Sequence, residues 1–135
     1  METILPRGDL SFDASATLTE LICTYQLQDL IGTAKIYEIE SDGEKAGAVI
    51  YQKGKRFETS CLYRVIKIKA VNNISEIPRL VKSSPSLEYL HTVGVALSEE
   101  KKGELEKGLK KLGVSRVTSI NGMYQPSLLE YEFLN

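Results

Sequence analysis

The chain has 135 residues, of which 42% are hydrophobic and 26% are charged, and its formal net charge is −1. This length and composition are ordinary for a folded protein, so we expect a single domain over residues 1–135. The nearly neutral charge offers no general attraction to nucleic acid or to an anionic membrane. No apolar run reaches the roughly 20 residues that span a bilayer, and no targeting segment is evident, so we expect a cytoplasmic protein.

Side chains that commonly bind metals or act as nucleophiles are scarce in this sequence. The two cysteines, Cys23 and Cys61, stand far apart, and His91 is the single histidine. A structural zinc site needs several such ligands at short spacing, so we expect no metal. We therefore expect both cysteines to be reduced thiols and His91 to have a structural role.

The first predicted element is a helix over residues 14–31. Apolar side chains such as Leu18 and Tyr25 recur there at helical spacing. Asp13 can cap the start of this helix, and Gly32 can end it in a left-handed conformation.

A hairpin and a further strand are expected next. Residues 35–40 and 48–51 predict two strands, joined by a turn at residues 41–43. Residues 64–71 are rich in Val and Ile and predict another strand.

The last part of the chain predicts a strand, a helix and a second strand. Residues 90–97 have the apolar and β-branched content of a strand that is covered on both faces. Ser98 can cap a helix over residues 99–111, Gly113 can end it, and the second strand starts at Val114. Such a βαβ unit requires parallel strands. The whole pattern predicts a three-layer α/β fold with a mostly parallel sheet and flanking helices.

Glycine-rich phosphate loops do not occur in the sequence. Neither a G-x-G-x-x-G turn nor a G-x-x-x-x-G-K-[ST] loop is present, so no pyrophosphate cradle is predicted. Gly103 and Gly108 fall inside the predicted helix, where a missing side chain permits close packing.

Five segments, in this order along the chain, carry a resemblance to a known family. They read L-P-R-G-D-L-S at residues 5–11, R-V-I-K-I-K-A-V at 64–71, T-V-G-V-A at 92–96, L-G-V-S-R-V at 112–117 and N-G-M at 121–123. Over nearly its whole length the chain resembles the C-terminal part of the acyl-CoA reductases typified by the reductase subunit of bacterial bioluminescence, the LuxC family. That family is similar to aldehyde dehydrogenases. The resemblance therefore implies the end of an aldehyde dehydrogenase-like catalytic domain.

The implied activity is the NADPH-dependent reduction of an acyl-CoA or acyl-protein thioester to a long-chain fatty aldehyde. In such reductases a cysteine thiolate takes the acyl group, and in this family that cysteine lies upstream of the segment at which this chain begins. Neither Cys23, which we expect to be buried in a helix, nor Cys61 occupies that position. We therefore expect an inactive C-terminal fragment with no catalytic residue and no bound cofactor of its own.

The resemblance also suggests three binding residues. Glu58 has roughly the placement of a glutamate that contacts the nicotinamide ribose, although the Gly-Pro that follows that glutamate in aldehyde dehydrogenases is absent. The alternative for Glu58 is a solvated charge beside Lys55 and Arg56. Arg64 and Arg116 stand at strand boundaries and match arginines of the family, where they can bind a substrate phosphate or carboxylate or pair with a neighbouring acid.

Two further expectations concern assembly and the class of function. A fragment that exposes apolar surface is expected to form a homo-oligomer. The alternative to a reductase fragment is a free-standing α/β module that binds a small molecule or a protein without catalysis. A continuous upstream coding region with a nucleotide-binding fold and a cysteine would distinguish the two.

Overall fold

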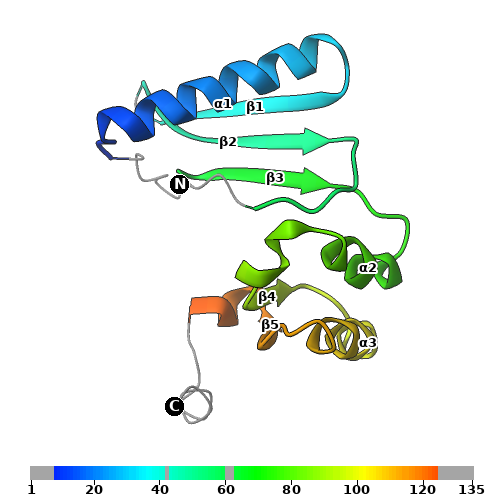
Figure 1. Cartoon of the computed structure of the whole chain (residues 1–135). Coiled ribbons are helices and arrows are strands. Elements are labelled where there is room, and N and C mark those ends of the chain that lie inside the picture. The colour runs from blue at the N-terminus through cyan, green and yellow to red at the C-terminus, as the bar shows by residue number, and fades with distance from the viewer. Residues whose placement is uncertain (1–7, 42, 60–62, 125–135) are drawn as a thin grey trace. The chain divides into compact units, whose positions relative to one another are not determined.

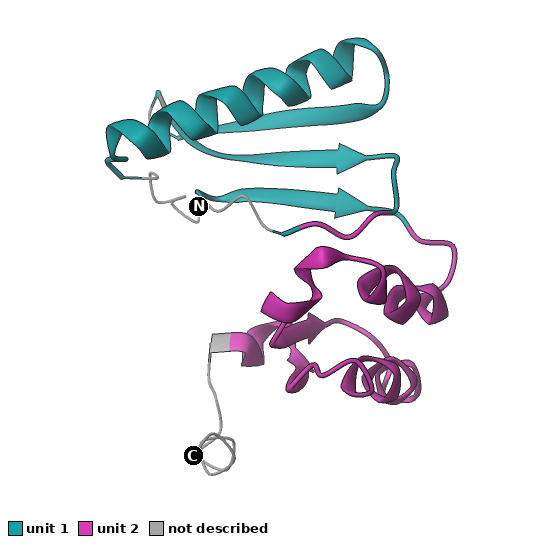
Figure 2. Ribbon diagram, in the orientation of Figure 1, with its two compact units in different colours: residues 1–55, 59–70 teal, residues 56–58, 71–135 magenta. Residues whose placement is uncertain are grey.

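The computed structural model describes residues 8–41, 43–59 and 63–124. The chain divides into two compact units, residues 1–55 with 59–70 and residues 56–58 with 71–135 (Figure 2). Among the described residues, each unit combines helical structure with a small sheet, one helix in the first unit and several in the second (Figure 1). The predicted α/β class is therefore confirmed, and each unit is described by itself.

The first unit pairs one long helix with a three-stranded sheet. Helix α1 (Phe12–Leu30) precedes strands β1 (Ala34–Ser41), β2 (Glu44–Gln52) and β3 (Val65–Lys69), which lie in the order β1-β2-β3. The predicted hairpin is confirmed, because β1 and β2 pair antiparallel, whereas β2 and β3 pair parallel. This sheet is therefore mixed rather than mostly parallel, since a turn as short as that between β1 and β2 can only join antiparallel strands.

The ends of α1 follow from local hydrogen bonding. Ser11 is the N-cap, and its hydroxyl accepts a hydrogen bond from the amide of Ala14 at 3.2 Å. Asp13 lies in the first turn instead, so the prediction that it caps the helix is wrong by two residues. Gly32 ends the helix as predicted, with a φ of 74° and its amide donating to the carbonyl of Asp29 at 3.0 Å.

The core of the first unit lies between α1 and one face of the sheet. The buried helix stripe packs against small and branched strand residues: Leu18, Ile22, Tyr25, Ala34, Ala48, Ile50 and Val65. The Tyr25 hydroxyl accepts a hydrogen bond from Nε2 of Gln52 at 3.1 Å, which satisfies the polar end of this aromatic side chain. The alternation of strand side chains explains why only every second strand residue contributes to this core.

The opposite face of the same sheet is apolar and exposed. We call this surface the open face, and its side chains are 37% to 60% exposed: Tyr37, Ile39, Tyr51, Ile66 and Ile68. Tyr37, Val49 and Ile66 stand opposite one another in register across the three strands. Among the described residues of this unit, α1 is the one helix, and it covers the other face.

One ion pair connects the end of α1 to the start of β1. The Asp29 carboxylate lies 2.8 Å from Nζ of Lys35 and also accepts a hydrogen bond from the amide of Ile36 at 3.1 Å. The hydrogen bonds from Lys35 and Ile36 lower the pKa of Asp29, and the bond to Asp29 raises the pKa of Lys35.

The second unit contains the predicted βαβ arrangement. Its elements in chain order are η1 (Ile74–Glu76), α2 (Ile77–Lys82), η2 (Pro85–Tyr89), β4 (Thr92–Val95), α3 (Glu99–Lys110), β5 (Arg116–Ser119) and η3 (Ile120–Tyr124). Strands β4 and β5 pair parallel and form a sheet of their own, with α3 between them in the chain. All four residues of β4 are half-buried, so both faces of this strand are covered in part and not fully as expected.

The core of the second unit forms around α3. Its fully or nearly buried side chains are Val81, Leu105, Leu109 and Val114. Gly113 ends this helix as predicted, with a φ of 92° and its amide donating to the carbonyl of Lys110 at 3.0 Å. A Cβ on Gly108 would lie 2.6 Å from Cγ of Pro78 in α2, whereas a Cβ on Gly103 would meet no atom within 4 Å. Close packing is therefore confirmed for Gly108 and not for Gly103.

We expect Gly108→Ala and Gly103→Ala to change stability in opposite directions. Alanine gains about 1 kcal/mol over glycine inside a helix, so Gly103→Ala should raise the free energy of unfolding by up to that amount. At Gly108 the added methyl group would overlap Pro78, and overpacking of this kind costs about 1–3 kcal/mol. Urea unfolding measures both variants. An equal gain in the two would show that α2 and α3 do not approach each other here.

The ion pair of Asp29 predicts a pH-dependent effect of Asp29→Asn. Because the pKa of Asp29 is lowered on folding, its contribution is present above the ordinary carboxyl pKa and is lost as pH falls through the lowered value. Asp29→Asn should therefore reduce the free energy of unfolding at neutral pH, and the difference from the parent chain should shrink in acid. Asp9→Asn, at an exposed carboxylate outside this pair, is the control. A difference that stays constant down to low pH would contradict the assignment.

Candidate functional site

A pocket opens where the two parallel strands of the second unit end. It has a volume of about 660 Å³ and is lined by residues after β4, at the start of α3 and after β5: Val95, Ala96, Leu97, Ser98, Glu99, Lys102, Ser119, Ile120 and Asn121. Ligands of open α/β sheets commonly bind at this position, because the carboxyl ends of parallel strands bring their loops together. This pocket is the best candidate site in the second unit.

Charged side chains occupy the rim of this pocket at the start of α3. Glu99 and Glu100 occupy the first turn of α3, where the helix dipole favours carboxylates. The ammonium group of Lys102 lies 3.9 Å from the carboxylate of Glu99. Ser98 is the N-cap, as predicted, but its hydroxyl makes no capping hydrogen bond. The two carboxylates make this helix start unsuited to a phosphate group.

The wall on the side of η3 is built from two segments that carry the family resemblance. A Cβ on Gly94 in β4 would overlap the side chain of Met123 and lie 3.3 Å from Cα of Ile120. The amide of Gly122 donates a hydrogen bond to Oγ of Ser119 at 3.2 Å. The T-V-G-V-A and N-G-M segments therefore meet in space, and Gly94 leaves the room that Met123 fills.

Arg116 holds this wall in place. Its Nη2 donates a hydrogen bond to the carbonyl of Gly122 at 2.7 Å, and its side chain is half-buried. A guanidinium group that is engaged in this way fixes the position of η3 after β5. The structure thus gives Arg116 a positioning role. From the sequence we expected its partner to be a bound substrate group or a neighbouring acidic side chain.

Arg64 belongs to the first unit and precedes β3. Tyr63 and Arg64 have φ values of 52° and 57°, a left-handed conformation that is uncommon for residues other than glycine. The carbonyl of Arg64 accepts a hydrogen bond from the amide of Ala48 at 3.1 Å, and a Cβ on Gly47 would lie 2.7 Å from that carbonyl oxygen. Gly47 therefore permits the close approach that fixes the backbone of Arg64.

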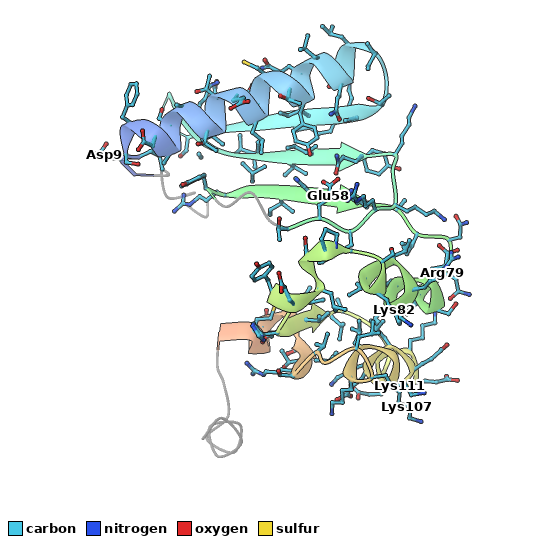
Figure 3. All side chains as sticks on the ribbon, in the orientation of Figure 1. Asp9, Glu58, Arg79, Lys82, Lys107 and Lys111 are labelled. Atoms are coloured by element: carbon cyan, nitrogen blue, oxygen red, sulfur yellow. The ribbon has the colours of Figure 1, made fainter. Side chains whose placement is uncertain are left out.

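Glu58 belongs to the second unit, where its neighbour anchors it. Phe57 packs against the core of that unit, and its carbonyl accepts a hydrogen bond from the buried hydroxyl of Ser84 at 2.8 Å. The side chain of Glu58 is exposed (Figure 3). Glu58 and Arg116 thus share one unit, and Arg64 lies in the other.

The remaining candidates have no catalytic surroundings. Cys23 is exposed on α1, so the prediction that it is buried among apolar neighbours is wrong: the helix turns it away from the stripe that contacts the sheet. Cys61 lies outside the described residues. His91 is exposed, and its carbonyl accepts hydrogen bonds from the amides of Ser115 and Arg116 at 3.1 and 3.0 Å. His91 therefore contributes to the pairing of β4 with β5 through its backbone carbonyl.

Two further features concern metals and membranes. Among the described residues, no three His, Cys, Asp or Glu side chains gather in a way that could hold a metal ion. None of the helices that the structure describes is long and apolar enough to cross a membrane.

The sequence analysis did not assign a pocket to its uncharged polar lining residues, which are Ser98, Ser119 and Asn121. The available signal was their position directly after two predicted parallel strands. A rule that examines every residue at the carboxyl end of such strands would have found them.

We expect Gly94→Ala to destabilise the second unit and Met123→Ala to relieve the effect. The added methyl group would overlap the Met123 side chain, which is 40% exposed and can move at moderate cost. A loss of about 1 kcal/mol is expected, and it should fall by half or more in the Met123→Ala background. Urea unfolding of the four chains forms a double-mutant cycle. Independent, additive effects would show that the two segments do not touch.

Comparison with known proteins supports the family resemblance that these segments carry. The family model described as Acyl-CoA reductase (LuxC) matches residues 1–127 of the 135-residue chain. No curated protein and no solved structure gives a significant match. The matched range includes both units as far as the structure describes them and all five segments that carry the resemblance. The chain therefore belongs to the acyl-CoA reductase (LuxC) family.

Proposed function

We propose that this chain is the C-terminal part of the catalytic domain of a long-chain fatty acyl-CoA reductase that works in the cytoplasm and makes fatty aldehyde with NADPH. The family match over residues 1–127 carries the proposal. The contact of Met123 with Gly94 supports it, because two of the resembling segments thereby meet, and these segments supply Val95 and Asn121 to the pocket lining.

The pocket at the ends of β4 and β5 supports a role in holding the acyl chain. Its lining includes Val95, Ala96, Leu97 and Ile120. Burying a methylene group is worth about 0.8 kcal/mol, so an apolar wall favours long-chain over short-chain substrates. We assign this wall to the acyl group of a thioester that is carried by coenzyme A or by a protein.

The described residues do not fit the main binding site of NADPH. The connection from β4 to α3 contains no glycine, and Glu99 and Glu100 follow it where a pyrophosphate would need free amides. Glu58 is the one residue that we assign to the cofactor, since a carboxylate can accept hydrogen bonds from two ribose hydroxyls. The nucleophilic cysteine and the remaining cofactor contacts are assigned to a part of the reductase upstream of this sequence.

The two arginines receive different proposed roles. Arg116 positions the pocket wall through Gly122, so its effect on the substrate is indirect. Arg64 stands at the start of β3 with an exposed side chain, and we assign it to the phosphate or carboxylate groups of the substrate.

The open face and the two small sheets suggest how the chain fits into a larger molecule. We assign both sheets to one three-layer catalytic domain, in which further elements cover the faces that are exposed here. We also propose a homo-oligomer, because large apolar patches rarely stay exposed.

A second candidate is a free-standing binding module. The observation that favours it is the position of the pocket, which lies within one unit and would persist without any further domain. Such a module would bind an acyl ligand without reducing it.

A reductase assay distinguishes the two and tests Glu58. The sequence is joined to the upstream part of a LuxC-family reductase, and NADPH oxidation is followed with a long-chain acyl-CoA. We expect aldehyde formation in the joined protein and none in the isolated chain. Glu58→Gln should raise KM for NADPH several-fold and leave KM for the thioester unchanged. Glu88→Gln, at another exposed glutamate of the same unit, is the control.

Two results would contradict this assignment. The first is turnover by the isolated chain, if Cys61→Ala abolishes it. That result would contradict the assignment of the nucleophile to an upstream part of the reductase. A joined protein that binds acyl-CoA but never oxidises NADPH would favour the binding module.

A further inference from the structure

Four cationic side chains gather on two helices of the second unit. Arg79 and Lys82 extend from α2, and Lys107 and Lys111 extend from the end of α3 and the residue after it (Figure 3). We call these four residues the basic surface. All four are exposed, and none forms an ion pair with any residue that the structure describes.

The contact between Gly108 and Pro78 brings these cations together. Because a Cβ on Gly108 would lie 2.6 Å from Cγ of Pro78, the two helices touch at this point. Arg79 directly follows Pro78, and Lys82 lies one turn later on the same side of α2. Lys107 directly precedes Gly108, and Lys111 lies one turn after Lys107. Each cation is thus within about one helical turn of the contact.

Two other lysines of α3 form ion pairs with glutamates of the same helix, in contrast to the residues of the basic surface. Lys102 pairs with Glu99 at 3.9 Å, and Lys110 pairs with Glu106 at 2.8 Å. The carboxylates that share a side of α3 with Lys107 are Glu104, one turn before it, and Glu100, one turn before Glu104. The negative ends of the two helix dipoles lie beside the four cations and reduce their mutual repulsion.

We propose that the basic surface docks an acidic face of a partner protein. Four cations spread over two adjacent helices match a broad set of carboxylates, and charges at the rim of an interface raise the association rate and select the partner. A compact anion would need a concave site. The pocket at the ends of β4 and β5 and the pocket beside His91 are both lined by other residues. The proposal does not depend on the reductase assignment.

The test is a titration of the isotope-labelled chain followed by NMR at low ionic strength. The probe is a synthetic helical peptide with glutamates along one face, and coenzyme A is the small-anion probe. We expect the peptide to shift the amide resonances of residues 77–82 and 107–112 most, and added salt should weaken peptide binding. Arg79→Gln with Lys82→Gln, and Lys107→Gln with Lys111→Gln, should each weaken binding by about fivefold or more.

A matched variant controls for overall charge. Lys53→Gln with Lys101→Gln removes the same charge outside the basic surface and should change the affinity by less than about twofold. Surface substitutions of this kind leave the fold intact. Equal weakening by the control pair would overturn the proposal, as would the absence of peptide binding. Stronger shifts of the same amides by coenzyme A would also overturn it, because the surface would then be a phosphate site.

Discussion

The structure of the first unit depends on a packing constraint: α1 covers one face of a three-stranded sheet. Ala34 and Ala48 are small enough to let the stripe of Leu18, Ile22 and Tyr25 approach the strands closely. The alternation of the strands then places tyrosines and isoleucines on the other side, where they are exposed. The unit itself therefore buries one face of this sheet and leaves the apolar open face exposed.

In the second unit, two glycines permit the contacts that shape the functional surfaces. Gly94 admits Met123 against β4, and Arg116 binds the carbonyl of Gly122. These contacts hold η3, which supplies Ile120 and Asn121 to the pocket lining. Gly108 admits Pro78 and so brings the basic surface together. The candidate pocket lies at the start of α3, and the basic surface lies near its end and on α2.

Local patterns predicted the elements well, and long-range contacts explain what they missed. Helical spacing and Gly32 predicted α1, and the turn after Ser41 predicted the hairpin, because both signals lie within a few residues. The exposure of Cys23 depends on which side of α1 meets the sheet, and the role of Arg116 depends on η3 folding back after β5. Neither contact leaves a trace in the spacing of neighbouring residues. The family itself was found from short segments, which the match over residues 1–127 confirms.

Light scattering most directly tests whether the open face is an interface. The intact chain should be larger than a monomer at high concentration, and Ile66→Lys, at the most exposed residue of the open face, should reduce the mass to that of a monomer. Leu30→Lys, at an exposed leucine at the end of α1, should leave the assembly unchanged. Circular dichroism confirms that each variant is folded. An intact chain that stays monomeric at every concentration, or equal masses for the two variants, would contradict this interpretation.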